Sequence, residues 1–218
     1  MTTSLHESFA SDIKPRTRFV EHFSGDALDT LRWEAYGQGT ETISMTDDGL
    51  SLQGGSNDND SAGIGFGGTI GGTQTMRPFN CRGSKIIFIQ KFSANGEYQA
   101  SESGFDKQLR PDAFGGVASG AGLITSHHNT NSKWVLRTAN GSDYSGSTYV
   151  TTSSMDTDWH VFSVECKPSS AVLTIDGVTE ATSTTYLPIE NMGVSFGLQS
   201  EGSADGQTWI RYCEAYNT

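Results

Sequence analysis

Hydrophobic and polar residues alternate in short runs from residue 19 onward, and turn-forming residues separate the runs. Residues 85–92, KIIFIQKF, form the strongest run, and their apolar character predicts a central strand. Residues 41–45 and 50–52 alternate around the turn 47–49, which is a hairpin signal. Residues 93–116 are expected to form a long surface excursion.

A second hairpin is predicted where residues 159–166 and 171–175 flank the loop 167–170, and Asp176-Gly177 then turns the chain again. Further strands are predicted at residues 19–23, 134–137, 147–151, 178–182, 193–198 and 209–216, and Ile64 and Phe66 alternate within the Gly-rich stretch 54–72. About a dozen strands without a convincing internal helix indicate an all-β, antiparallel two-sheet sandwich.

The first 18 residues have a different pattern. Ser4 and Glu7 fit a capping box at a helix start. Three apolar residues then recur on one helical face, Leu5, Phe9 and Ile13, before Pro15 ends any helix. We expect an N-terminal arm at 1–18, a short amphipathic helix, ahead of a sandwich domain at 19–218. Because so short a helix is unstable alone in water, its apolar face needs a surface on its own domain or on a partner chain.

Composition narrows the function classes. The 218 residues include 26 Gly and carry a formal net charge of −11, which argues against nucleic acid as the main partner. The 11 Phe, 7 Tyr and 4 Trp argue against disorder. No apolar run predicts a secretory signal or a membrane span. The three cysteines (Cys81, Cys166 and Cys213) are expected to be buried thiols of a chain folded in a reducing cytoplasm.

Four segments carry a family resemblance: residues 28–33 (LDTLRW), 48–52 (DGLSL), 158–165 (DWHVFSVE) and 173–177 (LTIDG). Their order resembles the concanavalin A-like lectin/glucanase superfamily, which includes laminin G-like modules and laminarinase-like glycoside hydrolases. The resemblance implies a jelly roll of two curved antiparallel sheets with the last strand beside the first. Trp159 is expected to anchor the core, and Asp176-Gly177 to supply the positive φ of a tight turn.

The two ends of the domain, residues 14–21 (KPRTRFVE) and 211–218 (RYCEAYNT), are similar to uncharacterised proteins of marine tailed phages. This resemblance implies a virion structural component, a capsid decoration or a tail-associated protein made in the host cytoplasm. The arm would dock on capsid or tail proteins, in a homo-oligomeric or lattice-bound state. The predicted contacts are Leu5, Phe9, Ile13, Lys14, Arg16 and Arg18.

Catalytic motifs are missing from the sequence. Laminarinase-like enzymes place their carboxylates on one strand as Glu-x-Asp-x-x-Glu, but no Glu of this chain has an Asp two residues later. A Gly-x-Ser-x-Gly elbow is also missing. His127 and His128 are adjacent, and we expect them in a solvated loop; His160 is expected at the surface or between strands. The sequence therefore predicts no enzyme.

The sequence offers candidate residues for two kinds of ligand. Asp58 and Asp60 offer hard oxygen ligands for calcium, although turn-forming residues explain this segment equally well. A glycan would need an exposed aromatic platform, and the loop aromatics selected for this role are Tyr98, Tyr144 and Trp209. The leading hypothesis is a non-enzymatic virion module with a glycan-adhesive surface. The alternatives are a stand-alone lectin-like module and a glycoside hydrolase or lyase with an unrecognised site.

Overall fold

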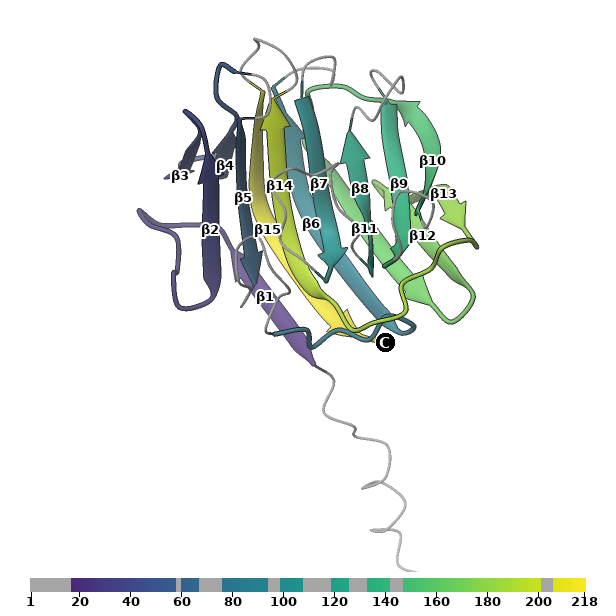
Figure 1. Cartoon of the computed structure of the whole chain (residues 1–218). Coiled ribbons are helices and arrows are strands. Elements are labelled where there is room, and N and C mark those ends of the chain that lie inside the picture. Colours follow the sequence, from purple (N-terminus) through teal and green to yellow (C-terminus); the bar gives the residue numbers. More distant parts are fainter. Residues whose placement is uncertain are drawn as a thin grey trace, which may run out of the picture.

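The computed structural model describes residues 17–57, 60–66, 76–93, 99–107, 119–125, 133–141, 147–200 and 206–218. Within these ranges the chain folds into two antiparallel sheets stacked face to face (Figure 1). The described residues include no helix, and thus no helix long and apolar enough to cross a membrane. The predicted all-β jelly-roll sandwich is confirmed.

The eight-stranded sheet has its strands in the order β13, β12, β11, β6, β15, β4 and β3, and β1 pairs with β15. Their bounds are β13 Val178–Ser183, β12 Ser170–Ile175, β11 His160–Lys167, β6 Ser84–Phe92, β15 Gln207–Asn217, β4 Gly49–Gln53, β3 Thr42–Thr46 and β1 Arg18–His22.

The seven-stranded sheet has its strands in the order β10, β9, β8, β7, β14, β5 and β2. Their bounds are β10 Ser147–Ser154, β9 Lys133–Asn140, β8 Ser119–Thr125, β7 Gln99–Asp106, β14 Gly193–Ser200, β5 Ser61–Phe66 and β2 Trp33–Gln38.

Strand β6 lies in the middle of the eight-stranded sheet, between β11 and β15, as the sequence predicts. Its residues alternate between buried and partly exposed along the whole strand. Phe88 and Phe92 therefore face the other sheet, whereas Ile87, Ile89 and Lys91 face outward. The same alternation continues on β15 and β11, so this sheet has one core face and one outer face.

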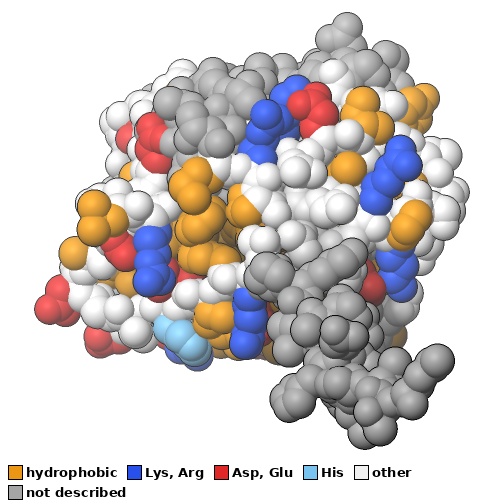
Figure 2. All heavy atoms as spheres, turned by 90° about the horizontal axis from the view of Figure 1, so that it is seen from below, with side chains coloured by type: hydrophobic (Ala, Val, Ile, Leu, Met, Phe, Trp, Pro, Cys, Tyr) orange, Lys and Arg blue, Asp and Glu red, His pale blue; other side chains and the backbone are white. Residues whose placement is uncertain are grey.

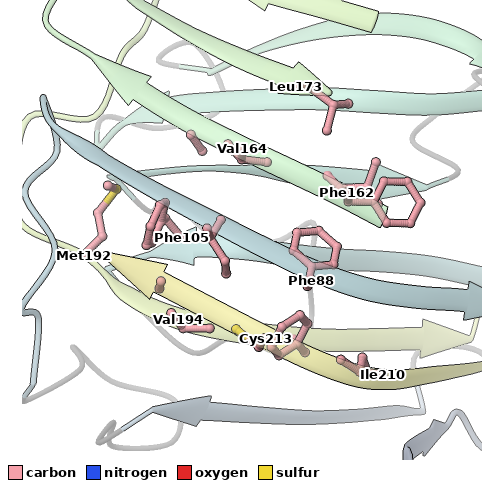
Figure 3. Close-up of a cluster of buried hydrophobic side chains, with 14 of the residues drawn as sticks. Phe88, Phe105, Phe162, Val164, Leu173, Met192, Val194, Ile210 and Cys213 are labelled. Carbon is pink, nitrogen blue, oxygen red and sulfur yellow. The ribbon is translucent and has the colours of Figure 1, made fainter. Parts of the chain in front are cut away.

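The core fills the space between the two sheets and is rich in aromatic rings. Phe88 stacks on Phe162 with ring centroids 5.4 Å apart and meets Phe196 of the other sheet edge-on at 5.6 Å. Figure 3 shows Phe88 and Phe162 beside Val164 and Leu173, which come from neighbouring strands. Contacts of this kind add to the burial of apolar surface that stabilises the sandwich.

The first described strand, β1, lies beside the last, β15, with Phe19 opposite Ala215. Asn217 ties this end of the sheet to other segments: its N–H donates to the Thr17 carbonyl, and its Nδ2 donates to the Pro78 carbonyl. The superfamily resemblance implied this arrangement of the ends, and the structure confirms it.

The structure corrects the expectation for residues 93–116. Strand β7 lies within this range, in the interior of the seven-stranded sheet between β8 and β14. Strands β2 and β8 also have no predicted counterpart. Polar and small residues predominate in these three strands, WEAYGQ, QASESGFD and SGAGLIT, and each has no more than two large hydrophobic residues, so the hydrophobic alternation is weak.

The three cysteines are free and buried, as expected. Burial raises the pKa of Cys166 to about 12 and raises that of Cys213 well above its ordinary value. Both thiols are therefore protonated and unreactive at neutral pH.

Candidate functional site

Two tryptophans and two cations meet on the outer face of the eight-stranded sheet. Trp209 of β15 pairs with Lys91 of β6, and Trp159 directly precedes β11. The Lys91 Nζ lies 4.5 Å from the centroid of the Trp209 ring and 4.9 Å from that of Trp159. The Arg211 Cζ lies 4.0 Å from the Trp159 centroid. We call these residues, together with Asp48, the tryptophan–cation cluster.

A β-bulge in β15 aims Arg211 at this cluster. Thr208 and Ile210 face the core, so Trp209 between them faces outward. The register against β6 then shifts between Ile210 and Tyr212, which leaves Arg211 as an extra residue on the outer side. Bulges commonly re-aim side chains next to functional sites.

Asp48, in the turn between β3 and β4, holds both cations in place. Lys91 Nζ donates to its Oδ2 at 3.0 Å, and Arg211 Nη2 donates to its Oδ1. The hydrogen bond from Lys91, followed by that from Arg211, lowers the pKa of Asp48. The carboxylate is therefore ionised at neutral pH, and the cation side chains are fixed beside the two indole rings.

The positions of Trp159 and His160 are the reverse of those expected. Trp159 is a partly exposed residue of the outer cluster, not a core anchor. The His160 ring instead packs edge-on against Trp134 and Phe162, with centroids 5.7 Å and 5.8 Å away. His160 pairs with the buried Gln90 of β6, so strand alternation places the imidazole on the core face and Trp159 on the outer face.

His160 is bonded to a carboxylate at each ring nitrogen. Its Nδ1 lies 2.6 Å from Asp176 Oδ2, and its Nε2 lies 2.8 Å from Asp156 Oδ1. Asp176 has φ 49° and precedes Gly177 with φ 82°, so the expected positive-φ turn is confirmed. Asp176 Oδ1 also accepts the N–H of Val161. The histidine and the Asp-Gly turn of the family resemblance thus contact one another directly.

A second charged cluster lies on the outer face of the seven-stranded sheet. Arg137 Nη1 on β9 donates to Glu102 Oε1 and lies 3.8 Å from Asp106 Oδ2, both on β7. The three side chains are 5%, 12% and 6% exposed, respectively. This cluster is a buried network in which one guanidinium contacts two carboxylates.

Glycines make room for this network. Arg137 pairs with Gly122 of β8, which pairs with Gly104 of β7, and Glu102 and Asp106 flank Gly104 at two residues on either side. The arginine side chain therefore crosses the β8 position where a side chain would otherwise stand. The backbones are also close, because a Cβ on Gly122 would lie 2.9 Å from the Ser103 carbonyl oxygen.

The Glu-x-Asp-x-x-Glu motif does not describe this carboxylate pair. Glu102 and Asp106 are four residues apart, with a glycine where that motif has its aspartate. The signal that could have found them is strand alternation, which places residues i, i+2 and i+4 on one face. The weak hydrophobic alternation of residues 99–106 hides this strand in the sequence.

Asp60 is hydrogen-bonded to its own loop and to the connection between β2 and β3. Its Oδ2 accepts hydrogen bonds from Thr40 N–H and Oγ1 and from Asn57 N–H and Nδ2, at 3.0 to 3.2 Å. All four are donors, which suits a turn-stabilising carboxylate. Asp58, the other predicted calcium ligand, lies outside the described residues. The described part of the chain has no group of three or more His, Cys, Asp or Glu that could hold a metal ion.

Of the remaining predicted site residues, only Arg18 lies within the part of the chain that the structure describes. Arg18 is the first residue of β1, and its Nε donates to Glu214 Oε1 at 2.8 Å within the same chain. Its side chain is 63% exposed, so it is still accessible to a partner. The other predicted arm residues and two loop aromatics lie outside the described residues: Leu5, Phe9, Ile13, Lys14, Arg16, Tyr98 and Tyr144.

At the end of the sandwich where β1 begins and β15 ends, hydrophobic side chains lie exposed beside Lys and Arg side chains (Figure 2). Met76 and Ile189, in the connections that enter β6 and β14, are both more than half exposed. Glu190, next to Ile189, pairs with Lys107 at 2.5 Å and with Arg77 at 3.1 Å. These ion pairs join the two connections and the end of β7.

Comparisons with known proteins match the fold. No family model matches the chain, and no curated protein matches it. Among solved structures, a pseudo β-1,3-glucanase of Mycobacterium tuberculosis superposes with TM-score 0.67 at 12% identity, covering 92% of this chain and 98% of that one. A β-glucanase of Bacillus licheniformis has TM-score 0.59 at 14% identity, with the same coverage. A sialidase has TM-score 0.64 at 10% identity, and the chain spans only 18% of its length.

These likenesses, together with the two antiparallel sheets, define the class: the chain has the concanavalin A-like jelly-roll fold of glucanases and related glycoside hydrolases. At 10% to 15% identity the matches show the fold alone. Because one fold carries many functions, the activity has to be argued from this chain's own residues.

Proposed function

We propose that the chain is a non-hydrolytic carbohydrate-binding jelly-roll protein and that the tryptophan–cation cluster is its contact surface. The observation that carries this proposal is the placement of Trp159 and Trp209 together on the outer sheet face, both partly exposed and both beside charged donors. The fold shared with glycoside hydrolases supports a glycan as the ligand class.

The cluster has the two components that sugar recognition needs. The apolar face of a pyranose packs on an indole ring, and its hydroxyl groups take hydrogen bonds from charged side chains. Trp209 is held by strand pairing, and both tryptophans lie against the cations, so little conformational entropy is lost on binding. Arg211, with a side chain 46% exposed and lying over the Trp159 ring, can donate to a hydroxyl group of a sugar on that ring.

The non-hydrolytic part rests on the Glu102 and Asp106 pair. A retaining glycosidase needs one carboxyl group protonated as the acid and the other ionised as the nucleophile. Here the Arg137 guanidinium contacts both groups in a buried setting: it donates to Glu102 Oε1 and lies 3.8 Å from Asp106 Oδ2. The pair therefore suits a structural ion network better than an acid–nucleophile couple.

A glycan array followed by titration calorimetry tests the proposal, with soluble β-glucan oligosaccharides as the first probes. We expect binding that Trp209→Ala weakens about tenfold or more, as for a central aromatic contact. Tyr36→Ala is the matched control, because Tyr36 belongs to β2 at the edge of the other sheet. A loss of binding in Tyr36→Ala but not in Trp209→Ala would move the site to the seven-stranded sheet and overturn the assignment.

A reducing-end assay on the same oligosaccharides tests the absence of hydrolysis. We expect no turnover above a protein-free blank. Turnover that disappears in both Glu102→Gln and Asp106→Asn would show that this pair is catalytic, and the non-hydrolytic assignment would then be wrong.

The location on a virus particle stays a prediction from the sequence. Deleting residues 2–16 leaves β1 complete and should abolish attachment to capsid or tail proteins if the arm docks there. Attachment of the shortened chain at full strength would contradict the arm hypothesis.

A further inference from the structure

The segment that carries Trp159 is attached to the turn between β12 and β13 through one imidazole. Asp156 lies four residues before His160 and bonds its Nε2, while Asp176 of the turn bonds its Nδ1. Asp156 Oδ1 also accepts the N–H of Asp158 at 2.8 Å, so the same carboxylate shapes residues 156–158. Trp159 lies in the chain between this turn and the bonded histidine.

The two hydrogen bonds depend on the charge of the ring. A carboxylate can only accept, so each ring nitrogen must donate, and only the imidazolium has two N–H groups. In the neutral ring one nitrogen presents a lone pair to a carboxylate, and that bond is lost. The geometry therefore selects protonated His160.

Within the described residues, the charged groups that face the ring are the two carboxylates. Trp134 of β9 and Phe162 of β11 pack against it, and the opposite residue on β6 is the uncharged Gln90. Lys91, the next residue, alternates to the outer face and pairs there with Asp48. No cation among these neighbours opposes a positive charge on the ring.

We propose that His160 is a pH-sensitive latch that holds Trp159 in the tryptophan–cation cluster while the imidazole is protonated and releases it when the proton is lost. The consequence for carbohydrate binding rests on the proposed function; the latch itself does not. Binding is then strongest at mildly acidic pH and weaker at alkaline pH.

The electrostatics agree with the geometry. Burial lowers the pKa of His160, but the hydrogen bonds that its ring donates to Asp176 and Asp156, together with the negative charge of these two carboxylates, outweigh it, and the net effect raises the pKa above its ordinary value of 6.5. A raised folded-state pKa means that the latch is complete below the ordinary value and opens as pH rises through the folded-state value. The pKa of Asp156 and that of Asp176 are both lowered below their ordinary value of 3.8. Both carboxylates therefore stay ionised, and able to accept from His160, down to acid pH.

Tryptophan fluorescence with acrylamide quenching tests the latch. Trp33 and Trp134 are 1% and 2% exposed, so in Trp209→Phe the quenchable signal comes from Trp159. We expect quenching of this variant to increase between pH 6 and pH 9. Adding His160→Gln should remove the pH step, because glutamine carries no charge in this range.

Two further variants separate the latch from a general effect of charge. Asp156→Asn removes a bonded carboxylate and should shift the step to lower pH. Asp158→Asn is the matched control, because it removes a carboxylate from the same segment that has no bond to His160. An unchanged step in Asp156→Asn, or the same step in His160→Gln, overturns the latch.

Titration of a bound β-glucan oligosaccharide at pH 6 and pH 9 connects the latch to the proposed function. We expect affinity to fall about fivefold at pH 9, the change that corresponds to losing one hydrogen bond. A quenching step without any carbohydrate binding supports the latch and removes the proposed function. Binding without any quenching step does the opposite.

Discussion

Arg137 shows how much a single residue can determine in this fold. Its guanidinium joins β9 to Glu102 and Asp106 on β7, and the side chains of all three are at most 12% exposed. A buried charge without its partner is costly, so each member depends on the others. The network fixes β7 in the interior of its sheet although that strand has few hydrophobic residues.

Replacing Arg137 should therefore lower the stability of the fold strongly. We expect Arg137→Leu to lower the free energy of unfolding by about 3–5 kcal/mol, because two carboxylates lose their buried cation. Arg18→Ala is the matched control: it breaks an ion pair in which the arginine is 63% exposed, and it should cost under about 1 kcal/mol. Urea unfolding measures both, and equal losses would show that the buried network contributes nothing special.

At the scale of the element, β7 depends on a backbone that only glycine adopts readily. Gly104 has φ 147°, and a Cβ there would lie 2.8 Å from Gly122 Cα on β8. The strand can therefore bring its backbone against β8 at the point where Arg137 crosses. A polar strand is held in the sheet by close backbone pairing and by a charge network.

The close pairing of Gly104 with β8 predicts the effect of one added methyl group. We expect Gly104→Ala to destabilise the fold by about 2 kcal/mol, through backbone strain and the close contact. Gly83→Ala is the control, because its φ is ordinary and its added Cβ would meet nothing closer than 3.6 Å. That change should fall within about 0.5 kcal/mol of the parent chain. Thermal unfolding of the two variants measures both changes. Equal stability of Gly104→Ala and the parent chain would show that an alanine at this position causes no backbone strain.

At the scale of the whole molecule, stability should depend on pH from both sides. Asp156 and Asp176 have a lowered pKa, so their stabilisation is present above the ordinary value of 3.8 and is lost as pH falls through the folded-state values. His160 has a raised pKa, so its stabilisation is present below 6.5 and is lost as pH rises through the folded-state value.

The melting temperature should therefore be highest between these two ordinary values and fall on either side. His160→Gln should remove the alkaline decline and leave the acid decline in place. Differential scanning calorimetry across pH 3 to 9 measures this, and an alkaline decline that survives in His160→Gln would assign it to other groups.

Individual strands show how much of the fold can be predicted from the sequence. The run at 85–92 predicts a central strand, and β6 is central, because its apolar residues alternate strongly. The hairpin around residues 47–49 is also confirmed, as β3 and β4. Strand β7 could not be predicted in this way, because a glycine and a cross-strand arginine hold it in place of apolar alternation.

The candidate site is likewise predictable only in part from the sequence. Trp209 is a candidate from sequence alone, but its companions Trp159, Lys91 and Arg211 come from separate strands and segments and meet only through sheet pairing. The β-bulge that turns Arg211 outward leaves no mark in the order of residues. A register shift is a property of two paired strands, so one strand's sequence does not reveal it.

The sequence by itself determined the all-β class, the buried thiols and the Asp-Gly turn, because each follows from local alternation, composition or backbone preference. Only the tertiary structure decided which face each tryptophan takes, which acids surround His160, and which arginine joins Glu102 to Asp106. The reason is physical: these contacts join residues far apart in the chain, and their geometry is set by strand order and register.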